Sequence, residues 1–240
     1  MVRVITGEEV ATFRGEEGGE GEVVCLLDLG LPCNMRCDGC DGRDAPLELS
    51  DDAAAGLSQA IVDGARERRA SGLALALYGG EPLLDPGGVL KFSARVRRAC
   101  DRAGIAYRAH LLTNGTLLAA LPPRVLTTAG FRTIQVTLEG ARRTHDERRR
   151  LADGRASWRL IVEGIKYARD EANVIVRAPV RAVGGGVEEL LGELDDEGLL
   201  EGERAIAVYV ARPAPYRVQA RELVKVTALL ARGRQPGARC

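Results

Sequence analysis

The stretch VVCLLDLGLPCNMRCDGC, residues 23–40, joins an apolar run to a loop that holds three cysteines at spacings of four and three. The apolar run, which starts at Val23, is typical of a buried strand in a parallel sheet. Cys33, Cys37 and Cys40 follow this strand. In sheets built from strand–helix units, functional residues gather in the loops after the strands. The stretch therefore predicts a parallel-sheet fold with a thiol site at the carboxyl end of its first strand.

Five more apolar, β-branched runs follow, and segments with helical periodicity separate them. The strands are expected to start at Leu73, Ala106, Thr133, Asn173 and Ala205, and the helices to cover a segment capped by Ser50 and residues 89–102, 157–169, 187–194 and 220–231. Such alternation predicts an α/β protein with a parallel sheet. Six units are too few for a complete eight-unit barrel, so a partial, open barrel and a doubly wound sheet both agree with the pattern.

The bulk composition narrows the class of protein. Hydrophobic residues make up 45% of the 240 residues, which is enough for a full core, and the formal net charge is zero. No overall field attracts nucleic acid or an anionic membrane, and no apolar run approaches the roughly 20 residues of a membrane span. The first residues lack the apolar core of a signal peptide, so a cytoplasmic location, where thiols stay reduced, is expected.

Three regions are expected along the chain. Residues 1–22 are expected to form a hairpin, with strands at Val2–Ile5 and Thr12–Phe13, or a flexible lead-in. Residues 23–214 are predicted to form the core, and residues 215–240 a C-terminal helix and tail.

The number of cysteines in the loop indicates what the site binds. A structural zinc site needs four ligands, and the two histidines, His110 and His145, lie outside the loop. Cys25 and Cys100 fall inside a strand and a helix, where they read as small buried hydrophobic residues. Iron–sulfur clusters are also usually held by four cysteines, so three leave one coordination position open, which is typical of a catalytic site. Unpaired thiols, or zinc with a distant fourth ligand, are the alternatives.

Three later motifs agree with an iron–sulfur site that has an open coordination position. The cysteine motif is followed by YGGEP from Tyr78, TNG from Thr113 and TLEG from Thr137, and this order resembles the radical S-adenosylmethionine (SAM) superfamily. Residues 135–165, QVTLEGARRTHDERRRLADGRASWRLIVEGI, resemble a segment of its SPASM-type branch, many of whose members modify ribosomally made peptides or mature sulfatases. The resemblance implies a partial (β/α)6 TIM-like barrel.

The resemblance also implies a chemistry. Cys33, Cys37 and Cys40 would hold three irons of one 4Fe–4S cluster, and SAM would bind the fourth. One electron would then split the sulfonium and give a 5′-deoxyadenosyl radical, which abstracts a hydrogen atom from a substrate. The chain is therefore expected to be an enzyme, and a non-catalytic relative is the less favoured alternative.

Several residues match the cofactor-binding positions of the family. In GGEP, glycine allows close approach of the backbone and Glu81 is expected to offset the ammonium charge of SAM. In the HDxxR match, Arg149 is expected to pair with the SAM carboxylate, whereas His145 is expected to be a structural hydrogen bonder. The implied cofactor-binding residues are Gly39, Gly79, Gly80, Glu81, Pro82, Asn114, Thr137, Glu139 and Arg149. Gly39 departs from the aromatic residue that is usual at its position.

The fourth predicted strand carries a polar face of its own. Gln135, Thr137 and Glu139 alternate with apolar residues, which indicates a wet lumen or, alternatively, an edge strand that faces solvent. The candidates for catalytic or substrate contacts are Gln135, Arg108, His110, Arg177, Arg212 and Tyr209, each with a purely structural role as its alternative.

The substrate is expected to be a peptide side chain, with a small metabolite (a sugar, nucleoside or amino-acid derivative) as the alternative. An external one-electron donor of the flavodoxin or ferredoxin type and a leader-peptide-binding partner protein are expected. The sequence ends at Cys240 without a further CxxC pair, so an auxiliary-cluster domain is not expected, and redox-neutral chemistry is favoured.

Overall fold

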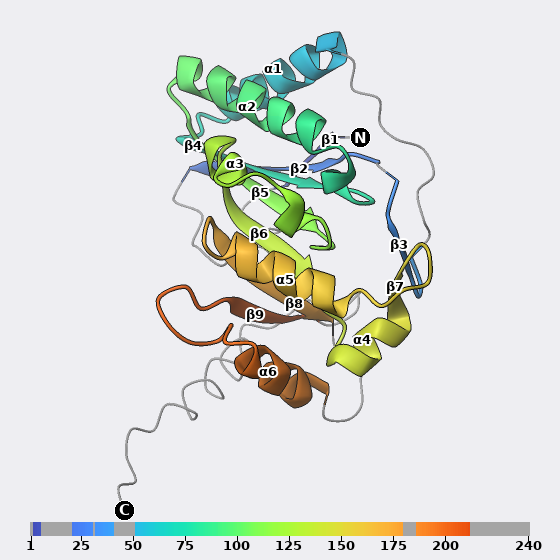
Figure 1. Cartoon of the computed structure of the whole chain (residues 1–240). Coiled ribbons are helices and arrows are strands. Elements are labelled where there is room, and N and C mark those ends of the chain that lie inside the picture. The colour runs from blue at the N-terminus through green and yellow to red at the C-terminus, as the bar shows by residue number, and fades with distance from the viewer. Residues whose placement is uncertain (1, 6–20, 31, 41–50, 180–185, 212–240) are drawn as a thin grey trace, which may run out of the picture.

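A computed structural model describes residues 2–5, 21–30, 32–40, 51–179 and 186–211, which form an α/β structure around a seven-stranded sheet (Figure 1). The strand order is β1-β2-β4-β5-β6-β8-β9, with six parallel strands and β1 antiparallel to β2. The strands are β1 Val2–Ile5, β2 Glu22–Asp28, β4 Gly72–Tyr78, β5 Ala106–Thr113, β6 Phe131–Thr137, β8 Asn173–Pro179 and β9 Ala207–Ala211. This confirms the predicted six parallel strands and the partial barrel.

The helices lie between successive strands, and all but α4, which contacts β7 and α5, lie along the sheet (Figure 1). They are α1 Asp51–Glu67, η2 Pro82–Leu84, α2 Pro86–Ala103, η3 Leu118–Ala120, α3 Val125–Thr128, α4 Arg142–Arg148, α5 Trp158–Ala168 and α6 Gly186–Asp196. Local sequence fixes the ends of α2: the Asp85 carboxylate accepts a hydrogen bond from Gly88 N at 2.9 Å, and Gly104 ends the helix with φ of 69°. The predicted Ser50 cap, the strand Thr12–Phe13 and the helix at 220–231 lie outside the described residues.

The two faces of the sheet differ in character. Leu75, Leu111 and Ile134 point toward the helices and are fully buried in the main core. The alternate residues point into the lumen, and there the register places Gln135 beside Leu112 and Ile175. β6 lies between β5 and β8, so it is not an edge strand. Its polar residues therefore face the lumen, which is the first of the two alternatives that the sequence left open.

A two-stranded antiparallel ribbon stands outside the main sheet, and the sequence analysis did not predict it. β3 (Met35–Cys37) pairs with β7 (Arg149–Leu151). The ribbon and α4 lie at the side of the sheet where β2 and β6 end, on the right in Figure 1. The cysteine loop is therefore tied to a segment more than a hundred residues away in sequence.

Part of the N-terminal segment belongs to the core sheet. The strand expected at Val2–Ile5, within residues 1–22, is present with these bounds as β1, and it pairs with β2 of the main sheet. Among the described residues, no helix is long and apolar enough to cross a membrane.

Candidate active site

The β3–β7 ribbon fixes the cysteine loop. Cys37 lies opposite Arg149 in the ribbon, and Asp38 N donates to the Arg148 carbonyl at 2.8 Å. Cys40 N donates to the Cys37 carbonyl at 3.1 Å, which turns the loop back toward the ribbon. Cys33 and Cys37 are half-buried and Cys40 is exposed. The three predicted ligands therefore share one hydrogen-bonded loop at the carboxyl end of the sheet.

Burial controls the thiols of this loop. It raises the pKa of Cys33, and it raises the pKa of Cys37 to about 11, although the nearby Arg149 guanidinium opposes this second shift. These thiols are therefore protonated near neutral pH and become thiolates when a metal displaces their protons. Cys25 and Cys100 are 1% and 0% exposed, as expected for cysteines that serve as small core residues.

The donor set of the loop fits an iron–sulfur cluster. In the part of the chain that the structure describes, no three His, Cys, Asp or Glu side chains are placed to hold one metal ion. A 4Fe–4S cluster makes no such demand, because each cysteine ligates a different iron. Thiolates are soft ligands that suit iron–sulfur ligation, whereas magnesium and calcium prefer oxygen ligands.

Glu81 is fully buried and joins the GGEP and TNG loops. Its Oε1 accepts hydrogen bonds from Thr113 Oγ1 at 2.7 Å and Leu83 N at 2.9 Å, and its Oε2 accepts one from Asn114 N at 2.7 Å. Burial raises its pKa, and these three donors act in the opposite direction. The structure thus gives the Glu81 carboxylate a structural role beside the expected contact with an ammonium group. Pro82 begins η2 directly after it.

Asn114 links this network to the cysteine loop. Its Nδ2 donates to Asn34 Oδ1 at 2.7 Å and lies 3.8 Å from Cys33 Sγ. Its Oδ1 accepts from the Thr116 hydroxyl at 2.7 Å, and Asn34 Nδ2 donates to that same hydroxyl at 2.9 Å. Asn114 therefore contacts a predicted ligand thiol from the third parallel strand of the sheet. Asn34 and Thr116 were missed, because an asparagine beside a cysteine and a threonine after a glycine carry no sequence signal.

Two glycines of the site adopt positive φ angles, which residues with a side chain rarely adopt. Gly79 has φ of 154°, and a Cβ there would lie 3.2 Å from Gly30 N and 3.4 Å from Asp28 Oδ1. Gly39 has φ of 72°, in the left-handed region that favours glycine. The absence of an aromatic residue at Gly39 thus goes with a backbone conformation that larger residues rarely adopt. Gly80, beside Gly79, is half-buried.

Glu139 and Arg149 face each other next to the cysteine loop. Arg149 Nη1 lies 3.7 Å from Glu139 Oε1, and both side chains are largely buried. Glu139 Oε2 and Arg149 Nε are buried and have no hydrogen-bond partner among the described residues. Buried polar atoms of this kind are costly unless something pairs with them, so they mark a place for a ligand.

His145 contacts the backbone of Glu139 directly and that of Arg149 through Ser157. Its Nδ1 accepts from Glu139 N at 3.1 Å, and its Nε2 lies 3.0 Å from Ser157 Oγ, which in turn donates to the Arg149 carbonyl at 2.5 Å. Burial lowers the pKa of His145 to about 3, so the ring is neutral. The prediction that His145 is a structural hydrogen bonder is consistent with these contacts, and Ser157 is a supporting residue that the sequence analysis missed.

The predicted lumen residues separate into layers along the strands. Thr137, Arg177 and Tyr209 lie side by side in register at the carboxyl ends of β6, β8 and β9. Gln135 lies two residues below Thr137 on the same face. Burial lowers the pKa of Arg177, and the nearby Arg149 adds to this effect. These residues share the end of the sheet that carries the cysteine loop.

Arg108 and His110 lie deeper in the lumen. Arg108 Nη2 pairs with Glu22 Oε2 at 2.5 Å near the amino ends of the strands, at the end opposite the cysteine loop. His110 is in register with Ala76 and Thr133 in the middle of the sheet, and burial lowers its pKa to about 4. The structure therefore does not bring Arg108 to the site. Arg212 lies outside the described residues.

Comparison with known proteins assigns the family. Residues 30–188 match the model of the Radical SAM superfamily, so the chain belongs to this superfamily. Its members use a 4Fe–4S cluster and SAM, and the chain is accordingly an enzyme of this class. No curated protein matches the chain.

Solved structures share the fold. Native anSMEcpe with bound AdoMet and the Cp18Cys peptide superposes with a TM-score of 0.62 at 14% identity, over 79% of this chain and 50% of that one. SuiB from Streptococcus suis, bound to S-adenosylmethionine, gives 0.54 at 18% identity, over 89% of this chain and 45% of that one. The chain thus spans about half the length of these structures.

Proposed function

We propose that this radical SAM enzyme abstracts a hydrogen atom from a peptide side chain held in the lumen. When bound, the cluster and SAM supply the 5′-deoxyadenosyl radical for that abstraction. The chain contributes Cys33, Cys37 and Cys40 as cluster ligands, and its other residues orient SAM and the substrate and keep water away.

The single observation that carries the proposal is the buried pair of Glu139 and Arg149, each with an unpartnered polar atom beside the cysteine loop. SAM carries an ammonium and a carboxylate, and these charges complement the Glu139 carboxylate and the Arg149 guanidinium. In this proposal Glu81 positions the GGEP backbone, and Asn114 donates to the Cys33 sulfur. Gly79, Gly80 and Thr137 line the same end of the sheet.

The substrate is assigned to the layer formed by Thr137, Arg177 and Tyr209, with Gln135 below it. Within the described residues, the Arg177 guanidinium makes no ion pair, so it can receive an anionic or carbonyl group of the substrate. A peptide is favoured because residues 135–165 resemble the SPASM-type segment and because anSMEcpe, which has the same fold, is described with a bound peptide. A catalytic core within residues 23–214 and an external electron donor belong to the same proposal.

The test begins with anaerobic reconstitution of the cluster, followed by dithionite and SAM. The expected product is 5′-deoxyadenosine, and its absence from a preparation with a well-formed cluster would refute the enzymatic part of the proposal. Cys37→Ala is expected to lose both cluster and product.

The peptide substrate needs a separate test. Peptides encoded near the gene are supplied in deuterated form, and deuterium is expected to appear in 5′-deoxyadenosine. Transfer from a deuterated small metabolite, with none from any peptide, would instead support the alternative substrate class.

A further inference from the structure

The β3–β7 ribbon has two faces with opposite tasks. Met35 and Leu151 pair on its inner face and are buried, and Cys37 and Arg149 pair beside them toward the site. Side chains alternate along a strand, so the residues between them point the other way. The third register pair, Arg36 and Arg150, therefore lies on the outer face, and both residues are exposed.

An arginine opposite an arginine is an unfavourable choice for the ribbon itself. Directly opposite side chains in an antiparallel pair have Cβ atoms about 4.5–5.5 Å apart, where like charges repel. Neither Arg36 nor Arg150 makes an ion pair with any residue that the structure describes. The outer arginine pair thus weakens the ribbon, and its presence points to a function outside the fold.

The surroundings carry an excess of positive charge. Residues 32–40 and 142–156 contain seven arginines, no lysine and four carboxylates, in a chain whose formal net charge is zero. Ion pairs engage three of these arginines: Arg155 with Asp153 at 2.7 Å, Arg142 with Asp146 at 3.9 Å and Arg149 with Glu139 at 3.7 Å. The other four, Arg36, Arg143, Arg148 and Arg150, make no ion pair with any residue that the structure describes, and the Asp38 carboxylate has a further interaction. Glu147 is exposed on α4.

The same ribbon carries one of the cluster ligands and adjoins another. Arg36 is covalently next to Cys37, and Cys40 is exposed on the adjoining loop. A partner seated on the outer face would therefore be separated from the cluster ligands by one strand. Electron transfer between proteins depends on such close approach, and complementary charge accelerates the encounter.

We infer that the outer face of the β3–β7 ribbon, with Arg36 and Arg150 at its centre, is the docking surface for an acidic electron-transfer protein of the flavodoxin type. The reduced flavin of the partner loses one electron and the cluster gains it, and no atom is transferred. The inference rests on the proposed function, because it assumes that the site receives an electron from outside.

The test compares a protein donor with a chemical donor. The holoenzyme is titrated with an acidic bacterial flavodoxin by calorimetry at low salt, and the rate of cluster reduction by the reduced flavodoxin is followed by absorbance. Arg36→Glu/Arg150→Glu is expected to weaken flavodoxin binding and slow this reduction at least about tenfold, because it reverses both central charges. Raising the ionic strength should weaken wild-type binding in the same way.

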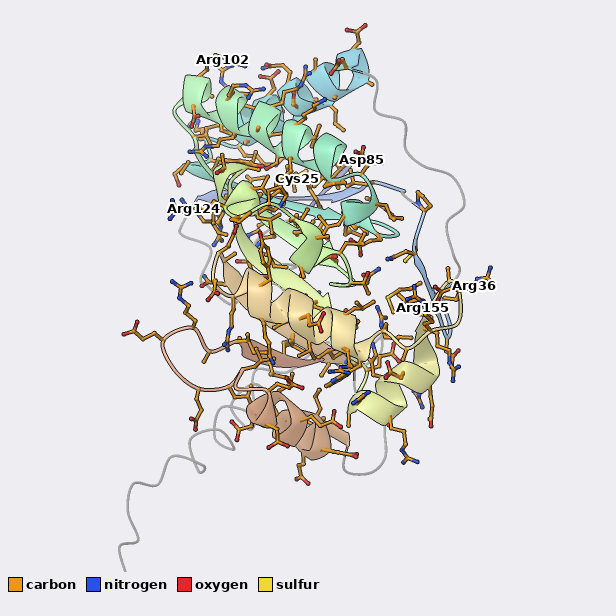
Figure 2. The ribbon with its side chains drawn as sticks, viewed as in Figure 1. Cys25, Arg36, Asp85, Arg102, Arg124 and Arg155 are labelled. Atoms are coloured by element: carbon orange, nitrogen blue, oxygen red, sulfur yellow. The ribbon has the colours of Figure 1, made fainter. Side chains whose placement is uncertain are left out.

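The single variant Arg36→Glu separates docking from structure. It places a carboxylate opposite Arg150, so it should leave the ribbon as stable as before or more so, while flavodoxin binding still weakens. The matched control is Arg66→Glu/Arg102→Glu, which changes two exposed arginines in the last turns of α1 and α2. Figure 2 shows Arg102 at the corner of the molecule away from Arg36, so this control should bind flavodoxin like the wild type.

Dithionite distinguishes the failure of this inference from failure of the proposed function. The ribbon variants should form 5′-deoxyadenosine with dithionite at the wild-type rate. If the wild type forms none with dithionite, the proposed function fails. If dithionite works and the ribbon variants bind flavodoxin as tightly as the wild type, the docking surface is wrong. A raised KM for the peptide in these variants, with unchanged flavodoxin binding, would overturn it too and assign the ribbon to the substrate.

Discussion

At the scale of single residues, Glu81 shows how a motif glutamate can serve the fold and the site together. Its carboxylate accepts from Thr113, Leu83 and Asn114, and its own N–H donates to the Pro32 carbonyl at 2.9 Å. Three segments, the GGEP–η2 turn, the TNG loop and the start of the cysteine loop at Pro32, are therefore tied together at one buried residue. A carboxylate can accept at both oxygens, which a carboxamide cannot do.

Glu81→Gln is therefore expected to destabilise the protein even before any cofactor binds. The amide NH2 would face N–H or O–H donors, and the free energy of unfolding should fall by about 2–4 kcal/mol. Urea denaturation of the apoprotein measures this, with the exposed Glu163→Gln as a control that should stay within about 0.5 kcal/mol of wild type. Unchanged stability together with weaker SAM binding would show that Glu81 serves the ligand alone.

Asn114 allows a second prediction at this scale. Hydrogen bonds to cluster sulfurs stabilise the reduced form and raise the reduction potential. Asn114→Ala removes the donor that lies 3.8 Å from Cys33 Sγ, so the potential of the reconstituted cluster should become more negative. A redox titration followed by electron paramagnetic resonance measures the shift. Asn34→Ala, which removes a neighbour of Asn114 without removing the sulfur donor, should leave the potential close to wild type.

At the scale of elements, the start of α5 is capped by a side chain of α4 and not by a residue next to it in sequence. The Asp146 carboxylate on α4 accepts from the backbone amides of Ser157 and Trp158, both at 2.9 Å, and so caps α5 across a loop. His145, the preceding residue, is fully buried against Trp158 with ring centroids 5.6 Å apart. The HD pair of the motif thus fixes the segment between α4 and α5, which includes β7 and its first residue Arg149.

Burial of His145 predicts a pH dependence of stability. Its pKa falls to about 3 in the folded state, while an unfolded chain protonates its histidines near pH 6.5. Below pH 6.5 only the unfolded state takes up this proton, so the stability that is present above pH 6.5 is lost as the pH falls toward 3. This residue should contribute a loss of about 1.4 kcal/mol per pH unit.

Urea unfolding between pH 7.5 and 4.5 measures this slope. His145→Gln should be less stable at pH 7.5 but show a flatter decline by that amount. His110→Gln is the comparison, because the chain has only two histidines and His110 contributes its own part. An unchanged slope in His145→Gln would mean that His145 is charged or accessible in the folded state.

The sequence predicted some elements well and could not show others. The six parallel strands were found because each is a run of apolar residues, or of apolar residues that alternate with polar ones as in β5 and β6, and helical periodicity separates one run from the next. The ribbon was not found, because MRC and RRL are too short and too polar to have a period. The pairing of Cys37 with Arg149 depends on how the α4 loop returns, which no local pattern specifies. The order of the motifs did assign Glu139 and Arg149 to one site, and the structure has them 3.7 Å apart. Their roles at that site stay predictions.

At the scale of the whole molecule, the lumen has two chemically different ends. The sequence predicted that both Arg108 and Arg177 face the lumen, since each lies on the inner face of a strand. Only the three-dimensional register separates them. At the amino end Glu22 reaches from β2 over Gly72, which has no side chain, to pair with Arg108 on β5. At the carboxyl end Arg177 has no ion-pair partner among the described residues.

The two arginines should therefore respond in opposite ways to the same substitution. Arg108→Met strands the largely buried Glu22 carboxylate, so the free energy of unfolding should fall by about 2–3 kcal/mol, while SAM cleavage without substrate stays near wild type. Arg177→Met removes a partly desolvated cation, so stability should change by less than about 0.5 kcal/mol, while turnover of the substrate falls at least about tenfold. Urea denaturation and product analysis on the two variants measure both quantities. Loss of stability in Arg177→Met with turnover intact would show that Arg177 is a structural residue like Arg108, and that the substrate lies elsewhere.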